Sequence, residues 1–171
     1  PMTMFQGINK LSPGHILTIS ENGNKTVSRY WEPTIHGKSM EGIDEAEIVD
    51  RLRELLRESI HLRMMSDVPF GVFLSGGVDS SLNVALMSEF MDRPVDTFSV
   101  AIKDDTRSDE LKHARAVAEY FGTNHHEAEI TSQDFINFLP QMTYFQDEPL
   151  SDPVCVPLYF VSRLAKQNGT K

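Results

Sequence analysis

Leucine and isoleucine side chains recur every three or four positions between residues 44 and 60, and charged residues fill most of the positions between them. This spacing gathers the apolar side chains on one face of a helix, so the segment is predicted to be an amphipathic helix. Asp44 and Glu47 resemble the capping box that often opens a helix. The apolar positions are Ile48, Leu52, Leu55, Leu56 and Ile60. We expect the three leucines to be core residues.

An apolar run at residues 68–74 follows and is nearly free of charge. Its strand-forming residues suit a strand buried on both faces of a parallel sheet, with Pro69 near the start of the strand. Helical and strand-like patterns then alternate, which predicts an α/β fold with a parallel sheet and helices on both faces. The predicted segments are a helix at 80–91, a strand at 95–102, a helix at 108–121 capped by Ser108, a strand at 124–130, and helices from 132 and from 157.

Prolines mark the expected interruptions in the last third of the chain. Pro140 is predicted to split the helical stretch that begins at Ser132 into two short helices, because a proline inside a helix removes a backbone hydrogen bond. Residues 147–153 contain two further prolines and are predicted to form a loop. Pro157 suits the first turn of the last helix.

The first part of the chain has a different pattern. Two β-prone runs, at residues 15–19 and 25–31, flank a segment that contains Asn22-Gly23, and this arrangement predicts a β-hairpin. Residues 32–42 carry proline and glycine with little periodicity, which indicates a linker. We therefore expect two parts, a hairpin with its linker over residues 1–40 and the α/β part over residues 41–171.

Composition and charge narrow the function classes. Sixteen Lys and Arg residues against 25 Asp and Glu residues give a formal charge of −9. A basic footprint for nucleic acid is therefore missing, and we expect no nucleic-acid partner. An acidic chain can still hold a small polyphosphate when backbone N–H groups and a divalent cation supply the positive field locally, which points to Mg²⁺.

Cysteine usage and hydropathy bear on location. The single cysteine, Cys155, cannot form an internal disulfide, and no apolar run approaches the roughly 18 residues of a membrane span. No signal peptide opens the sequence. We therefore expect a cytoplasmic protein without a membrane partner, and the oligomeric state, including a homodimer, stays open.

A glycine-rich motif, Ser-Gly-Gly-Val-Asp-Ser at residues 75–80, lies between the predicted strand and the helix that follows it. Ligands of open α/β sheets bind at the carboxyl ends of strands, where a phosphate meets the N–H groups and positive dipole of the next helix. Each part of the segment has a candidate role in holding phosphate. Gly76 and Gly77 allow close approach of the backbone, the hydroxyls of Ser75, Ser80 and Ser81 can donate hydrogen bonds, and Asp79 can hold a metal that bridges the phosphates.

The same motif excludes two common nucleotide chemistries. It lacks the Gly-Lys-Ser/Thr of a Walker loop and the three-glycine spacing of the dinucleotide fingerprint, so neither γ-phosphate transfer nor hydride transfer is indicated. A loop that grips the leaving pyrophosphate suits adenylation of a carboxylate by ATP. A plain polar turn is the structural alternative, but six matching positions between a strand and a helix favour a phosphate loop.

Residues 67–81 closely resemble the corresponding segment of the glutamine-hydrolysing asparagine synthetases. Further stretches resemble that family at residues 7–15, 97–100, 122–127 and 147–149, and in the helix that contains residues 162–164. The resemblance implies an ATP-pyrophosphatase synthetase domain with an adenine nucleotide alpha hydrolase-like, Rossmann-like fold. It also implies that Leu74 and Val100 lie near the AMP moiety.

The family's reaction is the adenylation of the aspartate side chain by ATP, followed by amidation with ammonia from a glutaminase domain. This chain starts at Pro1, not at the N-terminal cysteine of such a domain, and it stops before the position of the family's second motif, Ser-Gly-Glu-Gly-Ala-Asp-Glu. We therefore expect the N-terminal part of the synthetase domain, inactive by itself. Two alternatives stay open, a related amide- or lactam-forming synthetase with another carboxylate substrate and a non-catalytic nucleotide-binding fragment.

Two polar clusters remain. His125, His126 and Glu127 resemble metal ligands, but neighbouring residues of a strand point to opposite faces, so a structural role is the preferred interpretation. Asp147, Glu148 and Asp152 form an acidic group in the predicted loop, which could bind a metal or be an ordinary solvated loop.

Overall fold

The computed structural model describes residues 2–32, 42–103, 109–147 and 152–170. The chain divides into two compact units, Pro1–Ile43 and Asp44–Lys171. The predicted linker at residues 32–42, the Ser108 cap and Glu148 fall largely outside the described residues. Among the described helices, none is long and apolar enough to span a membrane.

The first unit contains the predicted hairpin. Strands β1 (His15–Ile19) and β2 (Lys25–Arg29) pair antiparallel, with Ile19 opposite Lys25. Gly23 adopts a φ of 82°, the left-handed conformation that the tight turn requires. The second strand ends at Arg29 and not at residue 31, because the N–H groups of Tyr30 and Trp31 both donate to the carbonyl of Gly14.

The second unit is built on a parallel sheet in the order β3-β4-β5. Strand β3 (Val72–Phe73) pairs with β4 (Asp96–Ile102), which pairs along its whole length with β5 (Asn124–Ile130). The predicted α/β fold class is confirmed. The helices of this unit are α1 (Glu45–Arg63), α2 (Val78–Phe90), α3 (Asp109–Phe121), α4 (Ser132–Gln146) and α5 (Cys155–Gln167). Helices α2, α3 and α5 contact the strands, whereas α1 packs on α2 and α4 packs on α5.

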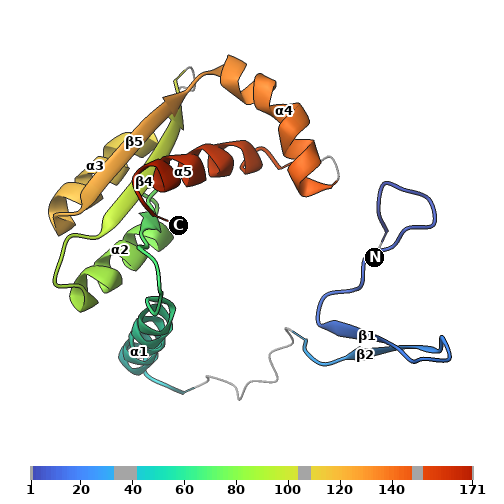
Figure 1. Ribbon diagram of the computed structural model, residues 1–171. Coiled ribbons are helices and arrows are strands. Elements are labelled where there is room, and N and C mark those ends of the chain that lie inside the picture. The colour runs from blue at the N-terminus through green and yellow to red at the C-terminus, as the bar shows by residue number, and fades with distance from the viewer. Residues whose placement is uncertain (1, 33–41, 104–108, 148–151, 171) are drawn as a thin grey trace. The chain divides into compact units, whose positions relative to one another are not determined.

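Helices cover both faces of the sheet, and Figure 1 shows the β4–β5 pair between α3 and α5. On one face, α2 and α3 pack against the strands through a cluster of small and medium apolar side chains. Its buried members are Val72, Leu74, Val84, Met87, Val95, Ala114 and Ala118. On the other face, Phe98 of β4 packs against Val161 and Ala165 of α5.

Two sequence expectations about helix α1 were wrong. Leu52 and Leu55 are 54% and 46% exposed, because α1 packs against the core only near its C-terminal end, through Ile60 and Met64. Asp44 makes no capping hydrogen bond, whereas Thr131 forms a complete capping box with Asp134 at the start of α4. In this box the Thr131 hydroxyl accepts from the N–H of Asp134, and the Asp134 carboxylate accepts from the N–H of Thr131.

Helix α4 is also continuous where a break was expected. Pro140 lies inside it, and both Pro140 and Ile136 are exposed, so water can solvate the Ile136 carbonyl that proline leaves without a helical donor. Helix α2 begins at Val78 and α5 at Cys155, each two residues earlier than predicted.

Strand β3 is shorter than the predicted run of seven residues. Its pairing starts at Val72, which lies opposite Thr97, and β4 itself begins only one residue earlier, at Asp96. Residues 68–70 therefore have no strand opposite them, and Pro69 has no N–H to donate.

Replacement of Phe98 by alanine tests the packing of the sheet on α5. Phe98 is 1% exposed and its ring stacks on His126 at 5.1 Å between centroids. We expect the free energy of unfolding to fall by about 3 to 5 kcal/mol, as for other buried aromatic truncations. Urea unfolding followed by circular dichroism measures this. Tyr120→Ala is the control, because Tyr120 is 83% exposed; equal losses for the two variants would contradict the packing described.

Candidate functional site

The glycine-rich loop begins where β3 ends, and β4 fixes its first residue from two sides. The N–H of Leu74 donates to the carbonyl of Phe98 at 2.8 Å, and the carbonyl of Leu74 accepts a hydrogen bond from the hydroxyl of Ser99. Ser99 is 4% exposed, so this bond is shielded from water. The start of the loop is therefore held in a fixed place at the carboxyl end of the sheet.

Serine hydroxyls tie the loop to the first turn of α2. The hydroxyl of Ser80 accepts from the N–H of Ser75 at 3.2 Å, donates to the carbonyl of Gly77 at 3.1 Å and lies 3.0 Å from the Ser75 hydroxyl. The hydroxyl of Ser81 donates to the same Gly77 carbonyl at 2.8 Å. Ser80 and Ser81 thus shape the loop itself, a role in addition to the phosphate contacts that the sequence predicted for them.

Gly76 lies against the backbone of α3. Its φ is 79°, and a β-carbon at this position would come within 2.6 Å of both the backbone nitrogen of Ala114 and the β-carbon of His113. Any other residue would be strained by the left-handed conformation and would collide with the helix. Gly77 is different, since its φ is −73° and a β-carbon would meet only the Ser75 hydroxyl at 3.4 Å.

The loop leaves several backbone donors without partners. The first hydrogen bond of α2 joins the N–H of Ser81 to Gly77, so the preceding N–H groups of Val78, Asp79 and Ser80 have no hydrogen-bond partner among the described residues. Together with the helix dipole they form a site suited to an anion.

Asp79 supplies the nearby carboxylate. It lies in the first turn of α2 and its side chain is exposed. No group of three or more His, Cys, Asp and Glu side chains in the described ranges could hold a metal by itself. A single carboxylate beside an anion site fits Mg²⁺, which binds through one or two carboxylates plus phosphate oxygens and water.

A pocket of about 460 Å³ opens at the carboxyl ends of β3 and β4. Its size and mostly apolar lining are typical of a small-ligand site. The lining residues are Phe73, Leu74, Ser75, Phe98, Ser99, Val100, Leu111, Ala114, Val154, Pro157, Leu158 and Val161.

The structure places the predicted site residues in two adjoining groups. Leu74, Ser75 and Val100 line the pocket. The others form the loop and the first turn of α2, namely Gly76, Gly77, Asp79, Ser80 and Ser81. Sequence reasoning missed the contributions of Ser99, α3 and α5 to the pocket, and only a serine inside an apolar strand gave any signal for them.

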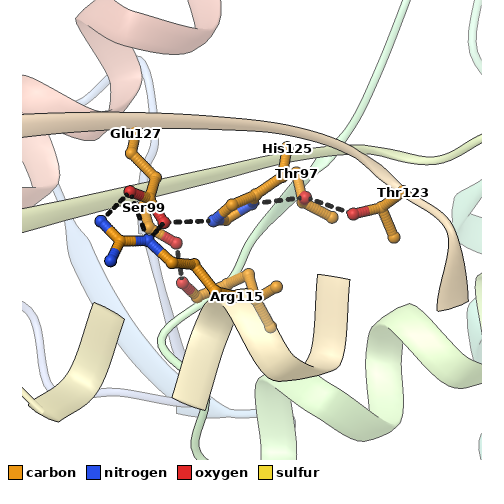
Figure 2. Close-up of polar contacts among 7 residues, drawn as sticks. Thr97, Ser99, Arg115, Thr123, His125 and Glu127 are labelled. Carbon is orange, nitrogen blue, oxygen red and sulfur yellow. Dashed lines mark hydrogen bonds and ion pairs between the residues drawn. The ribbon is translucent and has the colours of Figure 1, made fainter. Parts of the chain in front are cut away.

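The histidine pair is structural, and the predicted opposite orientation is confirmed. Nδ1 of His125 lies 2.8 Å from the Thr97 hydroxyl and its Nε2 lies 3.0 Å from Glu127, whereas His126 stacks on Phe98. Figure 2 shows that Arg115 of α3 completes this network at Glu127. The hydrogen bonds from Arg115 hold the pKa of the Glu127 carboxyl below its usual value.

The acidic group near residue 150 is only partly described. Asp147 ends α4 with a φ of 62°, and a carboxylate oxygen of Asp152 accepts from the N–H of Val154 at 3.0 Å. Asp152 thus has a structural partner at the start of α5.

Comparisons with known proteins place this arrangement in a family. A sequence profile described as asparagine synthase matches residues 51–171. Asparagine synthetase [glutamine-hydrolyzing] 1 of Bacillus subtilis (strain 168) is 34% identical over 170 residues, which cover 99% of this chain and 26% of that protein. Asparagine synthetase [glutamine-hydrolyzing] 2 of Arabidopsis thaliana is 31% identical over 93% of this chain and 28% of its own length. The chain thus spans little more than a quarter of these relatives.

Among solved structures, the NH3-dependent NAD synthetase of Campylobacter jejuni, in complex with a nitrate ion, superposes with a TM-score of 0.44 and 14% identity. The superposition covers 75% of this chain and 55% of that one. A likeness of this size carries nothing about function.

Replacing Gly76 by alanine tests the contact between the loop and α3. We expect Gly76→Ala to lower the free energy of unfolding by roughly 2 kcal/mol or more, since strain and overpacking each cost about 1 to 3 kcal/mol. Gly77→Ala is the matched control and should cost about 1 kcal/mol or less, because its β-carbon has room. Thermal unfolding by circular dichroism measures both, and similar losses for the two variants would argue against the contact.

Proposed function

Because this chain belongs to the asparagine synthase family, we propose that its loop and pocket bind ATP together with Mg²⁺ for adenylation of the aspartate side chain. The observation that carries the proposal is a set of N–H groups at the start of α2 that have no partner in the described part of the chain, next to an apolar pocket. The two regions match the two ends of a nucleotide, one charged and one aromatic.

The N–H groups of Val78, Asp79 and Ser80, with the dipole of α2, bind the pyrophosphate portion. Gly76 and Gly77 let the backbone approach the phosphate oxygens without side chains in the way. The hydroxyl of Ser75, which already lies 3.0 Å from that of Ser80, can turn to donate to an oxygen. Asp79 would hold Mg²⁺, which neutralises charge on the departing pyrophosphate.

The apolar pocket accepts the adenosine portion. Leu74, directly after β3, and Val100 of β4 line the cavity together with Leu158 and Val161 of α5. Aromatic bases bind in such clefts mainly by burying apolar surface, and backbone groups fix their orientation.

A loop that binds the leaving pyrophosphate suits attack of a carboxylate on the α-phosphorus of ATP. One oxygen of the aspartate side chain forms a bond to the α-phosphorus while the bond to the bridging oxygen breaks, and pyrophosphate leaves with that electron pair. The loop donors stabilise the negative charge as it moves onto pyrophosphate. Ammonia then attacks the activated carboxyl carbon and AMP departs, which gives asparagine.

The remaining partners belong to the same proposal. Both relatives named above are glutamine-hydrolysing synthetases by description, so we propose that a glutaminase domain supplies the ammonia. We also propose a cytoplasmic location, as expected from the sequence.

Asp79→Asn tests the metal and phosphate site. Calorimetric titration of the chain with Mg²⁺-pyrophosphate and with Mg²⁺-ATP should show saturable binding, and the variant should weaken it by about tenfold or more, since charged contacts are worth about 1.5 to 3 kcal/mol. Asp92→Asn is the matched control, because Asp92 is equally exposed but lies beyond the far end of α2.

The outcomes separate clearly. The site is supported if Asp79→Asn weakens the binding of Mg²⁺-pyrophosphate and Mg²⁺-ATP and Asp92→Asn leaves it unchanged. Absence of binding by a chain that circular dichroism shows to be folded, or equal effects of the two variants, would refute it.

A further inference from the structure

We propose that the ion pair between Arg115 and Glu127 positions the glycine-rich loop. It acts through the backbone of α3, which Gly76 contacts. Arg115 is thus a positioning residue and does not touch the ligand. The proposed function decides what the loop holds, but the positioning itself can be tested without any ligand.

The ion pair is bidentate and well anchored on the sheet. Nε of Arg115 lies 2.9 and 3.0 Å from the two carboxylate oxygens of Glu127, and a terminal nitrogen lies 2.7 Å from one of them. The Glu127 side chain is 21% exposed, and that of Arg115 is 54% exposed. Bidentate pairs of this kind combine strength with a fixed geometry.

Glu127 is itself held in place by β4 and β5. His125 lies between Glu127 and Thr97, and the Thr97 hydroxyl lies 2.9 Å from that of Thr123. Figure 2 shows these side chains as one row that ends at Arg115. The carboxylate is therefore a fixed point, and Arg115 fastens α3 to it.

Helix α3 contacts the loop next to Arg115. Arg115 directly follows Ala114, whose backbone nitrogen is the atom that a β-carbon on Gly76 would approach to 2.6 Å. At this contact a displacement of α3 by a fraction of an ångström forces the loop to move, because close-packed atoms transmit strain.

Small side chains lie at the part of α3 that meets the loop. Ala114 and Ala118 are 1% and 4% exposed. Larger side chains of the same helix are buried or pack against the same core, namely Leu111, Val117 and Phe121. Alanine side chains form low ridges, which interlock less than large side chains do. The directional contact of Arg115 therefore adds a geometric restraint next to Ala114.

NMR spectroscopy of the 171-residue chain tests the proposal through its glycine amides. We expect Arg115→Met and Glu127→Gln each to shift the amide signal of Gly76, and to leave Gly23 and Gly169 unchanged. The double variant should shift it no further than the single ones, because the pair acts as a unit. Arg51→Met is the control, since Arg51 forms an exposed ion pair with Glu54 on α1.

Acidification gives a second readout. The groups that face Glu127 are Arg115 from α3 and His125 from β5, and Glu119 and Glu129 also act on Arg115. The pKa of Glu127 is lowered in the folded state, so the pair's contribution is present above the unfolded pKa and is lost as the pH falls through the folded value. The Gly76 signal should move in that acidic range in the wild-type chain and not in Glu127→Gln.

Titration with Mg²⁺-pyrophosphate separates this proposal from the proposed function. We expect Arg115→Met to weaken binding by about three- to tenfold. A wild-type chain that binds no pyrophosphate, but whose Gly76 signal moves in the variants, would refute the function and support the positioning. Folded variants with an unchanged Gly76 signal would overturn the positioning. If Arg115→Met does not fold, Arg115→Lys replaces it, because lysine keeps the positive charge but cannot form the bidentate hydrogen bonds of the guanidinium group. An unchanged Gly76 amide signal in Arg115→Lys would equally overturn the proposal.

Discussion

The close contact between Gly76 and the backbone of α3 is the constraint on which the site depends. A β-carbon at position 76 would lie 2.6 Å from helix atoms, so the loop can occupy its place only with glycine there. The contact joins elements that are distant in the sequence, and the loop that it fixes runs from Leu74 and Ser75, which line the pocket, into the first turn of α2. The lack of room for a β-carbon at Gly76 fixes the shape of the loop. It also requires α3 to stay in position.

Polar contacts on the sheet keep both sides of that contact fixed. On the loop side, Leu74 is bound to β4 through its N–H and its carbonyl, the latter by the buried hydroxyl of Ser99. On the helix side, Arg115 binds Glu127, which the row of His125 and Thr97 supports. Contacts within the chain therefore hold the loop, and under the proposed function little of it would have to be ordered on binding.

Local patterns in the sequence were sufficient for the order of elements, and long-range contacts were not visible in them. The glycine motif between an apolar strand and a helix predicted the loop, and alternation predicted β4 and β5 to within a residue. The exposed Leu52 and Leu55 and the continuous helix through Pro140 depend on which neighbours are present, which periodicity does not encode. In the same way, Gly76 was expected to approach phosphate, but its contact with His113 and Ala114 could not be foreseen from residues nearly forty positions apart. The roles of the loop residues in binding stay predictions.

Under the proposed function, the backbone N–H groups at the start of α2 bind a polyphosphate. The most direct measurement is an NMR titration of the chain with Mg²⁺-pyrophosphate that follows every assigned amide. We expect the largest saturable shifts on Gly76, Val78, Asp79 and Ser80, because these amides would take phosphate as their acceptor. Largest shifts elsewhere, or none at saturating ligand in a folded chain, would contradict it.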